Sequence, residues 1–558
     1  MKLVLVSMPA RDSPEALPLG AASIAAAIKA AGASVPELRA VMTVSLEARP
    51  GESPAKVASR IASEKPDAVG FSVYSWNRTA FAEAAKRLRA AMPGLILFAG
   101  GPEATADPEA FALQAGLDFA IAGEGESAAV AAMSAIALFG RDALRDIAGV
   151  VLPGRAWRRA PPEEASALPS PWLLGTMDLE GCGGDVVWEL SRGCPFRCAY
   201  CYESKGSSGS RPFPMERIEA ELDLFARSGV RYAFVLDPTF DADPERAALL
   251  LDLFRARAPG MRWKFEVRAE LLNKALVRRF AALDCSLQIG LQSARSETLA
   301  CVGRPGFDRR EFARKIAMLN QAGVSFGLDL IYGLPGDRLS DFEEGVDFAL
   351  GLGPNHLDIF PLALLPGTEL AERAAELGIE AEGEPPYLVR RTRELPPADL
   401  EKAAALAMAA DRFYTAGRAV GWFDAARRPL RFSPAVILKE FGSYSAARGG
   451  RGLGNNRGPD DPLSIEAEQL GFLEAAYEKA GLGGLFPALR DLVRLHGAWG
   501  RALAEGEESL LALSYDPEEV LGAAAAGLAA FVRSATRSSS EWRIVPDEED
   551  GARMERSR

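Results

Sequence analysis

Histidine is almost absent from this 558-residue chain, which contains only His356 and His496. That scarcity excludes the commonest zinc sites, which use several histidines, and it argues against a Ser-His-Asp triad. The sequence has no uninterrupted apolar run of about 18 residues, so it predicts no membrane span. The first residues, MKLVLVSMPARDSPEALPLG, lack a small-residue cleavage site after a long apolar run. They are typical of a buried strand and not of an export signal.

The chain also has no excess of basic over acidic residues. The chain has 76 Asp and Glu against 64 Lys and Arg, a net charge of −12, which argues against a dedicated nucleic-acid binder. Its six cysteines are too few for a disulfide scaffold. With 48% hydrophobic and 25% charged residues the composition is that of a soluble, core-forming protein. At roughly 100–200 residues per domain, the length suggests about three domains.

Residues 1–150 alternate short apolar runs with alanine-rich helical stretches. This alternation predicts a Rossmann-like α/β domain, with a parallel sheet covered by helices on both faces. In such sheets ligands bind beyond the carboxyl ends of the strands, which is where the glycines of this segment fall. The strands are predicted within 2–9, 67–75, 95–102 and 118–126, and the helices within 19–32 and 78–92.

The rest of the chain is predicted to form three further parts. Residues 151–184 are proline-rich and predict a linker. Residues 185–390 predict a partial (β/α)6 barrel, with chemistry at the carboxyl ends of its strands. Residues 391–558 predict a mainly helical domain, with a loop at 445–461, a lid over the barrel mouth at 438–458 and a frayed tail. The barrel strands are predicted at 185–190, 232–237, 262–268, 286–292, 325–334 and 356–364.

The strongest signal is the segment SRGCPFRCAYCYES, in which Cys194, Cys198 and Cys201 have the spacing C-x3-C-x2-C. Three thiolates on one tight loop can hold three corners of a cubic iron–sulfur cluster and leave one iron open. A structural zinc site would need four ligands, usually in two pairs, and Cys182 is the one conceivable fourth ligand. Free core cysteines are a further alternative, but they leave the flanking Gly193 unexplained. The spacing therefore favours an iron–sulfur cluster.

With Tyr200 in its aromatic position, this loop resembles the signature of the radical S-adenosylmethionine (radical SAM) superfamily. The resemblance covers residues 185–390 and implies a [4Fe–4S] cluster on the three cysteines, with S-adenosylmethionine on the open iron. Reductive cleavage of the sulfonium would release a 5′-deoxyadenosyl radical. The resemblance also implies an external one-electron reductant, flavodoxin or ferredoxin. The oxygen sensitivity of such a cluster predicts a reducing cytoplasm.

The resemblance places further S-adenosylmethionine contacts at the strand ends. Tyr200 is expected beside the adenine. Asp237 or Thr239 is expected at the methionyl amine, where this chain departs from the common Gly-Gly-Glu pattern. At each single position, an ordinary paired or solvated charge is the competing interpretation. The other candidates are Glu266 and Arg268 for the ribose and carboxylate, Gln292 and Ser293 at the fourth strand, Arg304 for the carboxylate, and the backbone of 331–337 for the adenine.

Residues 1–150 resemble the cobalamin-binding domain that precedes the barrel in one class of this superfamily. Gly100 and Gly101 open a turn that a flat macrocycle could approach closely. An empty Rossmann-like domain remains an alternative, whereas a dinucleotide site is disfavoured because G-x-G-x-x-G does not follow the first strand. The candidate cobalamin-binding residues are Ser72, Tyr74, Gly100, Gly101, Thr105, Gly123, Glu124 and Gly125.

The Asp-x-His-x-x-Gly motif of many cobalamin proteins is missing, and no histidine precedes His356. This domain therefore offers the cobalt no lower histidine, and the segment 74–78 is the candidate for the lower face. His356 is expected to be structural, and His496 is expected to be structural or on the surface. Cys285 and Cys301 are expected to be ordinary small buried or helix-surface residues.

Together the two modules predict methyl transfer to an unactivated carbon of a small molecule or peptide. The alternatives are a radical cyclisation or rearrangement, a methylthiotransferase, and a non-catalytic iron–sulfur and cobalamin redox sensor. The methylthiotransferase is disfavoured because the sequence shows neither a second cysteine triplet upstream nor a small C-terminal RNA-binding barrel.

Overall fold

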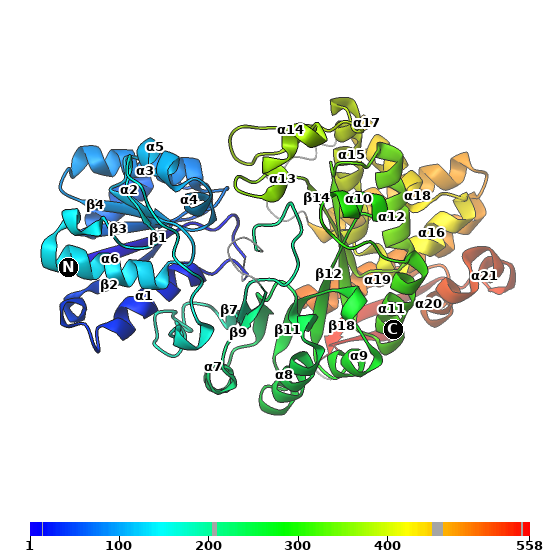
Figure 1. Ribbon diagram of the computed structural model, residues 1–558. Helices are drawn as coiled ribbons and strands as arrows, with labels where there is room; N and C mark the ends of the chain where they lie inside the picture. The colour runs from blue at the N-terminus through cyan, green and yellow to red at the C-terminus, as the bar shows by residue number, and fades with distance from the viewer. Residues whose placement is uncertain (14, 204–208, 449–460, 548–550, 558) are drawn as a thin grey trace. The chain divides into compact units, whose positions relative to one another are not determined.

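The computed structural model of the chain describes residues 1–13, 15–203, 209–448, 461–547 and 551–557 (Figure 1). Its internal contacts divide the chain into two units. The first unit holds Met1–Leu287, Val302–Arg304 and Ala363–Arg390, and the second holds Gln288–Cys301, Pro305–Leu362 and Arg391–Arg558.

The first unit begins with a six-stranded sheet of order β2-β1-β3-β4-β5-β6. Strands β1 to β5 pair in parallel, and β6 is antiparallel to β5. Leu3, Val4, Leu5 and Val6 of β1 are all buried, as a strand covered on both faces requires. The strands are β1 Lys2–Ser7, β2 Met42–Glu47, β3 Ala68–Ser72, β4 Ile96–Gly100, β5 Phe119–Ile121 and β6 Val150–Val151.

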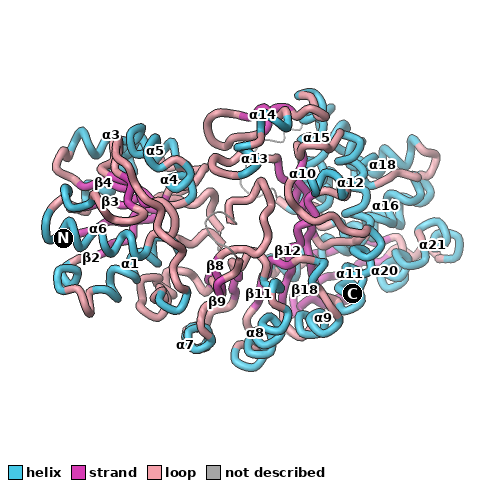
Figure 2. Tube along the Cα trace, in the orientation of Figure 1, coloured by secondary structure: helices cyan, strands magenta, loops and turns pink. Residues whose placement is uncertain are grey.

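Helices cover both faces of this sheet (Figure 2). Val4 and Val6 belong to the core formed with α2, α3 and α5, whereas Leu3 and Leu5 belong to the core formed with α1 and α6. The predicted parallel α/β domain is therefore confirmed. The helices are α1 Leu19–Ala31, α2 Pro54–Ser63, α3 Arg78–Ala91, α4 Pro102–Ala106, α5 Pro108–Ala115 and α6 Glu126–Phe139.

Two details of this sheet differ from the prediction. Strand β2 was not predicted, because it is an edge strand in which Leu46 is the one buried residue and no apolar run marks it. The strand predicted over 118–126 ends at Ile121, because Gly123 has a φ of +95° and starts the turn into α6.

Val151 belongs to β6, and residues 152–184 contain turns, irregular backbone and one short 3-10 helix, Ala165–Ala167. The absence of longer elements is what the proline-rich composition predicts. Leu168, Trp172 and Met177 are nevertheless buried, so the segment packs against the first unit. The predicted domain boundaries at 150, 184 and 390 stay predictions.

The second sheet has the order β14-β13-β12-β11-β10-β7, and the division between the two units falls within β12, after Leu287. Each of the six predicted strands corresponds to one strand of this sheet. The strands are β7 Asp185–Trp188, β10 Tyr232–Val235, β11 Arg262–Val267, β12 Cys285–Gln292, β13 Ser325–Tyr332 and β14 His356–Pro361. The intervening helices are α7 Met215–Arg227, α8 Pro244–Arg257, α9 Lys274–Phe280, α10 Ser296–Cys301, α11 Arg309–Ala322 and α12 Leu339–Gly351.

Aromatic side chains support the part of this sheet that belongs to the first unit. The rings of Phe254 and Trp263 stack with centroids 4.4 Å apart, and Trp188 packs edge-on against Phe225 at 5.3 Å. The Trp188 indole donates a hydrogen bond to Glu221 Oε2 at 2.5 Å. These contacts pack helices α7 and α8 against strands β7 and β11.

Residues 363–390 return to the first unit after β14. The predicted strand over 356–364 is shorter than expected: β14 ends at Pro361, and one further backbone bond, from the Leu362 N–H to the Tyr332 carbonyl at 2.9 Å, follows it. Beyond it, the Leu370 N–H donates to the Ala199 carbonyl at 2.8 Å, and the Tyr387 hydroxyl donates to Glu103 at 2.7 Å. The elements here are α13 Glu369–Glu372, α14 Ala374–Leu377, β15 Glu380–Ala381 and β16 Val389–Arg391.

The last part of the second unit is mainly helical, as predicted, but it also contains an antiparallel sheet of order β17-β18-β19. The prediction of a frayed tail is wrong for residues 551–556, because they pair with β18 around the buried side chains of Ile544 and Ala552. The helices are α15 Pro397–Ala410, α16 Phe423–Leu430, α17 Pro434–Ala447, α18 Pro462–Lys479, α19 Phe486–Glu505, α20 Pro517–Ala526 and α21 Leu528–Ser534; the strands are β17 Ser509–Leu513, β18 Ser540–Asp547 and β19 Gly551–Arg556.

The glycine-rich part of the predicted loop and lid, residues 449–460, lies outside the described residues. The residues before it, up to Ala447, belong to helix α17. Within the part of the chain that the structure describes, none of the helices combines the length and apolar character that a membrane crossing requires.

Candidate cofactor site

The cysteine loop, residues 193–210, is closed at its base by a two-stranded ladder. Strand β8 (Ser191–Arg192) pairs antiparallel with β9 (Arg211–Pro212), so the two ends of the loop start side by side. Cys194, Cys198 and Cys201 are half-buried on this loop.

Segments remote in sequence hold the middle of the loop. The Ala199 N–H donates to the Val302 carbonyl at 2.8 Å, and the Ala199 carbonyl accepts from Leu370. Gly303 has a φ of +66° and packs so closely that a Cβ there would lie 2.8 Å from the Arg197 carbonyl oxygen. The backbone around the three thiols is therefore fixed from two sides.

The thiols themselves are electrostatically coupled. Burial raises the pKa of Cys201 to about 12, and the nearby charges of Glu203, Cys198 and Cys194 raise it further. Cys194 Sγ lies 3.8 Å from Thr239 Oγ1. Ligation requires thiolates, so iron would release these protons on binding.

The donor set suits a cluster better than a single ion. Among the described residues, no three His, Cys, Asp or Glu side chains converge on a point that could hold one metal ion. A cubic cluster instead distributes its three protein thiolates over three iron atoms. Three half-buried thiols on one fixed loop fit that arrangement.

Asp237, at the end of β10, is tied to the base of the cysteine loop. Its carboxylate accepts hydrogen bonds from the backbone N–H groups of Leu190 and Ser191, at 2.8 and 3.1 Å, and from the Ser191 hydroxyl at 2.6 Å. Burial raises its pKa to about 6 despite these bonds. A contact with the methionyl amine stays a prediction for Asp237, whose visible role is to hold β7 and β8 to β10.

Arg268, at the end of β11, contacts the cysteine loop directly. Its guanidinium lies 3.8 Å from the ring centroid of Phe196, between the first two cysteines, and donates to Glu270 at 3.2 Å. Its backbone N–H donates to Asp241 Oδ1 at 3.0 Å. The structure therefore brings this predicted S-adenosylmethionine contact to the cluster loop.

Asp241 was missed by sequence reasoning. The side chain is fully buried, and its Oδ2 has no hydrogen-bond partner among the described residues. Burial raises its pKa to about 7. The sequence DPTFDAD offers three aspartates in this turn and no periodicity that singles out the buried one.

Glu266 and Arg304 are two other predicted contacts in the first unit. Burial raises the pKa of Glu266 to about 7, although the positive charge of Lys264 opposes the rise. Arg304 is buried, and its charge acts on Tyr200, whose phenol pKa is raised chiefly by burial and then by Cys198. Arg304 thus lies near the aromatic residue of the cysteine motif.

Gln292 and Ser293 belong to the second unit. Gln292 has a φ of +68°, an uncommon conformation for a residue other than glycine. The Ser293 hydroxyl accepts from the Arg295 N–H and lies 3.4 Å from Asp337. Asp337 ends the predicted adenine-contacting segment 331–337. The S-adenosylmethionine contacts of these residues stay predictions.

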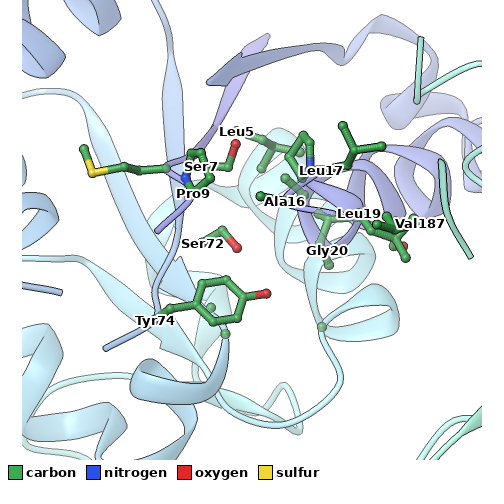
Figure 3. Close-up of a pocket in the computed structure, with 18 of the residues that line it drawn as sticks. Leu5, Ser7, Pro9, Ala16, Leu17, Leu19, Gly20, Ser72, Tyr74 and Val187 are labelled. Atoms are coloured by element: carbon green, nitrogen blue, oxygen red, sulfur yellow. The ribbon is translucent and has the colours of Figure 1, made fainter. Parts of the chain in front are cut away.

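A cavity of about 660 Å³ opens in the first unit beyond the carboxyl ends of β1, β3, β4 and β5 (Figure 3). The loop between β1 and α1 and the first turn of α1 form one side. Another side is formed by Val187 of β7 and Phe234 of β10, together with Glu189 and Leu236, which directly follow these strands. Ser72, Tyr74, Gly100, Gly101, Gly123 and Gly125 of the predicted cobalamin set line this cavity.

Glycine is required where the backbone turns into this cavity. Gly101 has a φ of +101°, and a Cβ there would lie 2.7 Å from the Val73 carbonyl oxygen. A Cβ at Gly20 would lie at ordinary contact distance, 3.8 Å from the Tyr74 hydroxyl and 4.0 Å from Ser72 Oγ. The glycines that line the cavity, among them Gly20, Gly100, Gly101, Gly123 and Gly125, have no side chain that would keep a large flat group away from the backbone.

The predicted lower-face segment forms one wall of this cavity. The rings of Tyr74 and Trp76 stack with centroids 4.4 Å apart, and both line the cavity. The Trp76 indole donates to the Met8 carbonyl at 2.8 Å. The Asn77 side chain donates to the Met8 and Ser72 carbonyls and accepts from the Tyr74 N–H. It therefore stabilises the turn that follows β3.

A second cavity of about 350 Å³ adjoins the first. It is lined by Thr105, Glu124, residues 159–162 and the start of the cysteine loop. Thr105 Oγ1 accepts from the Gly123 N–H at 3.0 Å, so this hydroxyl braces the neighbouring turn. The residues common to both cavities are Gly101, Gly123, Glu189, Arg192, Glu203 and Leu236.

Glu124 has a partner that the sequence did not indicate. Both of its carboxylate oxygens accept hydrogen bonds from Arg211, and one also accepts from the Glu163 N–H at 2.9 Å. Arg192, Arg211 and Glu126 were likewise missed, although the sequence places one arginine beside each end of the cysteine loop.

Both histidines pack against glycines of the second unit. A Cβ at Gly327 would overlap the ring of His356, and a Cβ at Gly421 would overlap that of His496. His356 Nε2 lies 2.7 Å from Gln288 Oε1. Burial lowers the pKa of His496. These contacts agree with the predicted structural role.

Comparisons with known protein families and structures agree with both predicted modules. The model of the radical SAM superfamily matches residues 188–349, and that of the B12 binding domain matches residues 12–133. The chain is 28% identical over 342 residues to a 2-(S-pantetheinyl)-carbapenam-3-carboxylate methyltransferase of Streptantibioticus cattleyicolor, covering 56% of this chain and 50% of that protein. It is 27% identical over 359 residues to the cobalamin-dependent radical SAM methyltransferase TokK of Streptomyces tokunonensis, covering 58% and 51%.

Solved structures share the fold. The cobalamin-dependent S-adenosylmethionine radical enzyme OxsB, with aqua-cobalamin bound, matches 96% of this chain and 84% of its own with a TM-score of 0.60 at 14% identity. The radical S-adenosylmethionine methyltransferase TsrM of Kitasatospora setae, with cobalamin and a [4Fe–4S] cluster bound, matches 72% and 84% with a TM-score of 0.56 at 17% identity.

The fold and the cysteine loop together define a radical enzyme with a B12 domain ahead of its barrel. The chain carries a domain of the radical SAM superfamily and a B12 binding domain, the two modules of cobalamin-dependent radical SAM enzymes. Its cofactors are accordingly a [4Fe–4S] cluster, S-adenosylmethionine and cobalamin. The chain spans about half the length of the two curated relatives, so what those proteins do is not carried over with the family.

Proposed function

We propose that this protein transfers a methyl group to an unactivated carbon of a small molecule or peptide. The observation that carries the proposal is the wall shared by the two cavities of the first unit. Gly101 and Gly123 of the B12 domain meet Glu189, Arg192 and Leu236 of the barrel there. A substrate bound next to this shared wall would face both the cysteine loop and the cobalamin cradle.

When bound, the cluster with S-adenosylmethionine supplies a hydrogen-abstracting carbon radical, and cobalamin supplies a methyl group. Cys194, Cys198 and Cys201 would hold the cluster. We propose that Tyr200, Asp237, Glu266, Arg268, Gln292, Ser293 and Arg304 bind S-adenosylmethionine, and that Ser72, Tyr74, Gly100, Gly101, Thr105, Gly123, Glu124 and Gly125 form the cobalamin cradle.

Side chains of the chain itself would also control the surroundings of the reacting groups. Val187, Phe234 and Leu236 present apolar surface to the first cavity, which excludes water and competing hydrogen donors from a radical. Arg268 lies over Phe196 and would place a positive charge beside the cluster loop, where a carboxylate of S-adenosylmethionine could be held.

One consideration favours methyl transfer over cyclisation or rearrangement: both curated relatives reported above are named as methyltransferases. We further propose that an external one-electron reductant, flavodoxin or ferredoxin, reduces the cluster.

The test uses the reconstituted full chain with trideuteromethyl S-adenosylmethionine, a one-electron reductant and a small-molecule extract. We expect a product that carries the intact trideuteromethyl group and appears only when cobalamin is present. S-adenosylhomocysteine and 5′-deoxyadenosine should form alongside it in equal amounts. Formation of 5′-deoxyadenosine without label transfer would contradict methyl transfer and favour a rearrangement. Formation of neither product would favour a sensor.

A further inference from the structure

Two arginines stand opposite each other at the base of the cysteine loop. Arg192 of β8 and Arg211 of β9 are direct partners in the antiparallel ladder. Two glutamates flank Gly125 where the turn after β5 meets α6 of the B12 domain: Glu124 lies in the turn, and Glu126 is the first residue of α6. All four residues belong to the first unit.

Each arginine binds one glutamate of this turn. Arg192 Nη2 lies 2.7 Å from Glu126 Oε1 and 3.2 Å from Glu189 Oε2. Both Nη atoms of Arg211 donate to the two oxygens of Glu124. Such bidentate pairing of a planar guanidinium with a carboxylate fixes orientation as well as distance.

These pairs are sheltered from water, which distinguishes them from ordinary surface ion pairs. The Arg192 and Glu126 side chains are 15% and 7% exposed, and those of Arg211 and Glu124 are 21% and 24% exposed. Burial acts to raise the pKa of Glu124, but the hydrogen bonds and charge of Arg211 outweigh it and leave the pKa below its usual value. The negative charge of the Glu124 carboxylate therefore depends on its pairing with Arg211.

The pairs also stand on the wall between the two cavities. Arg192 and Glu126 line the first cavity, and Arg211 and Glu124 line the second. Gly125, between the two glutamates, packs against α1: a Cβ there would lie 2.9 Å from Ile24 Cδ1. A displacement of the loop base would therefore move the turn that faces the cradle, and the reverse holds as well.

We propose that Arg192–Glu126 and Arg211–Glu124 form a clamp that sets the distance between the cluster and the cobalamin. These are positioning residues: they act through the two loops and not through contact with the reacting atoms. The inference rests on the proposed function, because a fixed separation matters only if both cofactors serve one substrate.

The test measures that distance directly by pulsed dipolar EPR. The full chain is reconstituted with cluster and cobalamin and reduced until both the cluster and cob(II)alamin are paramagnetic. We compare wild type with Arg211→Glu, Glu124→Arg and the double variant that exchanges the two charges. The single variants are expected to broaden the distance distribution at least about two-fold, because each leaves like charges facing each other. The exchanged pair is expected to restore a narrow distribution.

Arg412→Glu serves as the control, because it breaks a similarly sheltered pair with Glu468 in the second unit. It is expected to leave the distribution narrow. If a single variant loses its cofactors, Arg211→Gln and Glu124→Gln take its place, with broadening again expected. A narrow wild-type distance in all cofactor-loaded variants would overturn the clamp. A distance distribution in the double variant that is no narrower than in the single variants would overturn the clamp as well. The distance is measured without substrate, so failure of the methyl-transfer assay would leave this result readable.

Discussion

Replacing Cys198 by alanine is expected to remove nearly all cluster iron and to lower 5′-deoxyadenosine formation at least about 100-fold, because no other group supplies the electron for this cleavage. Cys198 is the middle ligand of the triplet, and its turn with Cys201 is closed by a 3.0 Å backbone hydrogen bond. The remaining two thiols would hold a cluster by two corners only. Iron and sulfide analysis of protein purified without air checks the first part, and chromatography of S-adenosylmethionine products checks the second.

Cys182→Ala is the matched control, because Cys182 is also half-buried and was the conceivable fourth ligand of a zinc site. It is expected to keep wild-type iron content and product formation. Iron loss in Cys182→Ala equal to that in Cys198→Ala would contradict the three-thiolate cluster and would make Cys182 a fourth iron ligand.

Gly101→Ala is expected to weaken cobalamin binding by about 100-fold. The backbone at Gly101 has a φ of +101° and a ψ of 178°, a region that residues other than glycine enter at a cost of about 1–3 kcal/mol. The added methyl group would also lie 2.7 Å from the Val73 carbonyl oxygen, so the turn must move. A displaced turn would narrow the cradle where the macrocycle approaches. Absorbance titration of the apo chain with cobalamin measures the affinity.

The Gly116→Ala variant distinguishes a change in the cobalamin cradle from the backbone strain that alanine causes at any positive-φ glycine. Gly116 also has a positive φ, +68°, but a Cβ there would meet nothing within 4 Å. The control variant is expected to lose some stability and to keep its cobalamin affinity. Equal affinities in the two variants would show that the turn at Gly101 has no part in the cradle.

The sequence was informative where chemistry or burial is local. The apolar runs of β1, β3, β4 and the six barrel strands are short and bounded by glycine or polar residues, so their positions could be predicted to within a few residues. The cysteine triplet could be recognised because all its ligands lie within eight residues. The cradle glycines could be proposed because they follow strand ends in a parallel sheet.

Long-range pairing could not be predicted in the same way. The structure pairs Glu124 with Arg211, 87 positions away, a contact that the sequence did not indicate. Asp237 carries three hydrogen bonds from Leu190 and Ser191. Tyr387 donates to Glu103 across 284 positions. A charged or polar residue in a turn has the same local signature whether it faces a ligand, solvent or a distant partner.

The C-terminal sheet escaped prediction for a related reason. Strand β18, Ser540–Asp547, has one fully buried side chain, Ile544, among mostly polar neighbours. Its partner β19 is dominated by charged residues. Each strand alternates polar and apolar residues over only four positions, 541–544 and 552–555, which is too short a pattern to stand out in the sequence.

The most direct test of the account is the EPR spectrum of the anaerobically reconstituted, reduced wild-type chain, recorded before and after addition of S-adenosylmethionine. A cubane held by three thiolates with its fourth iron accessible predicts a [4Fe–4S]+ signal whose g-values shift when S-adenosylmethionine is added. Zinc in place of iron, or a cluster signal that S-adenosylmethionine leaves unchanged, would contradict it.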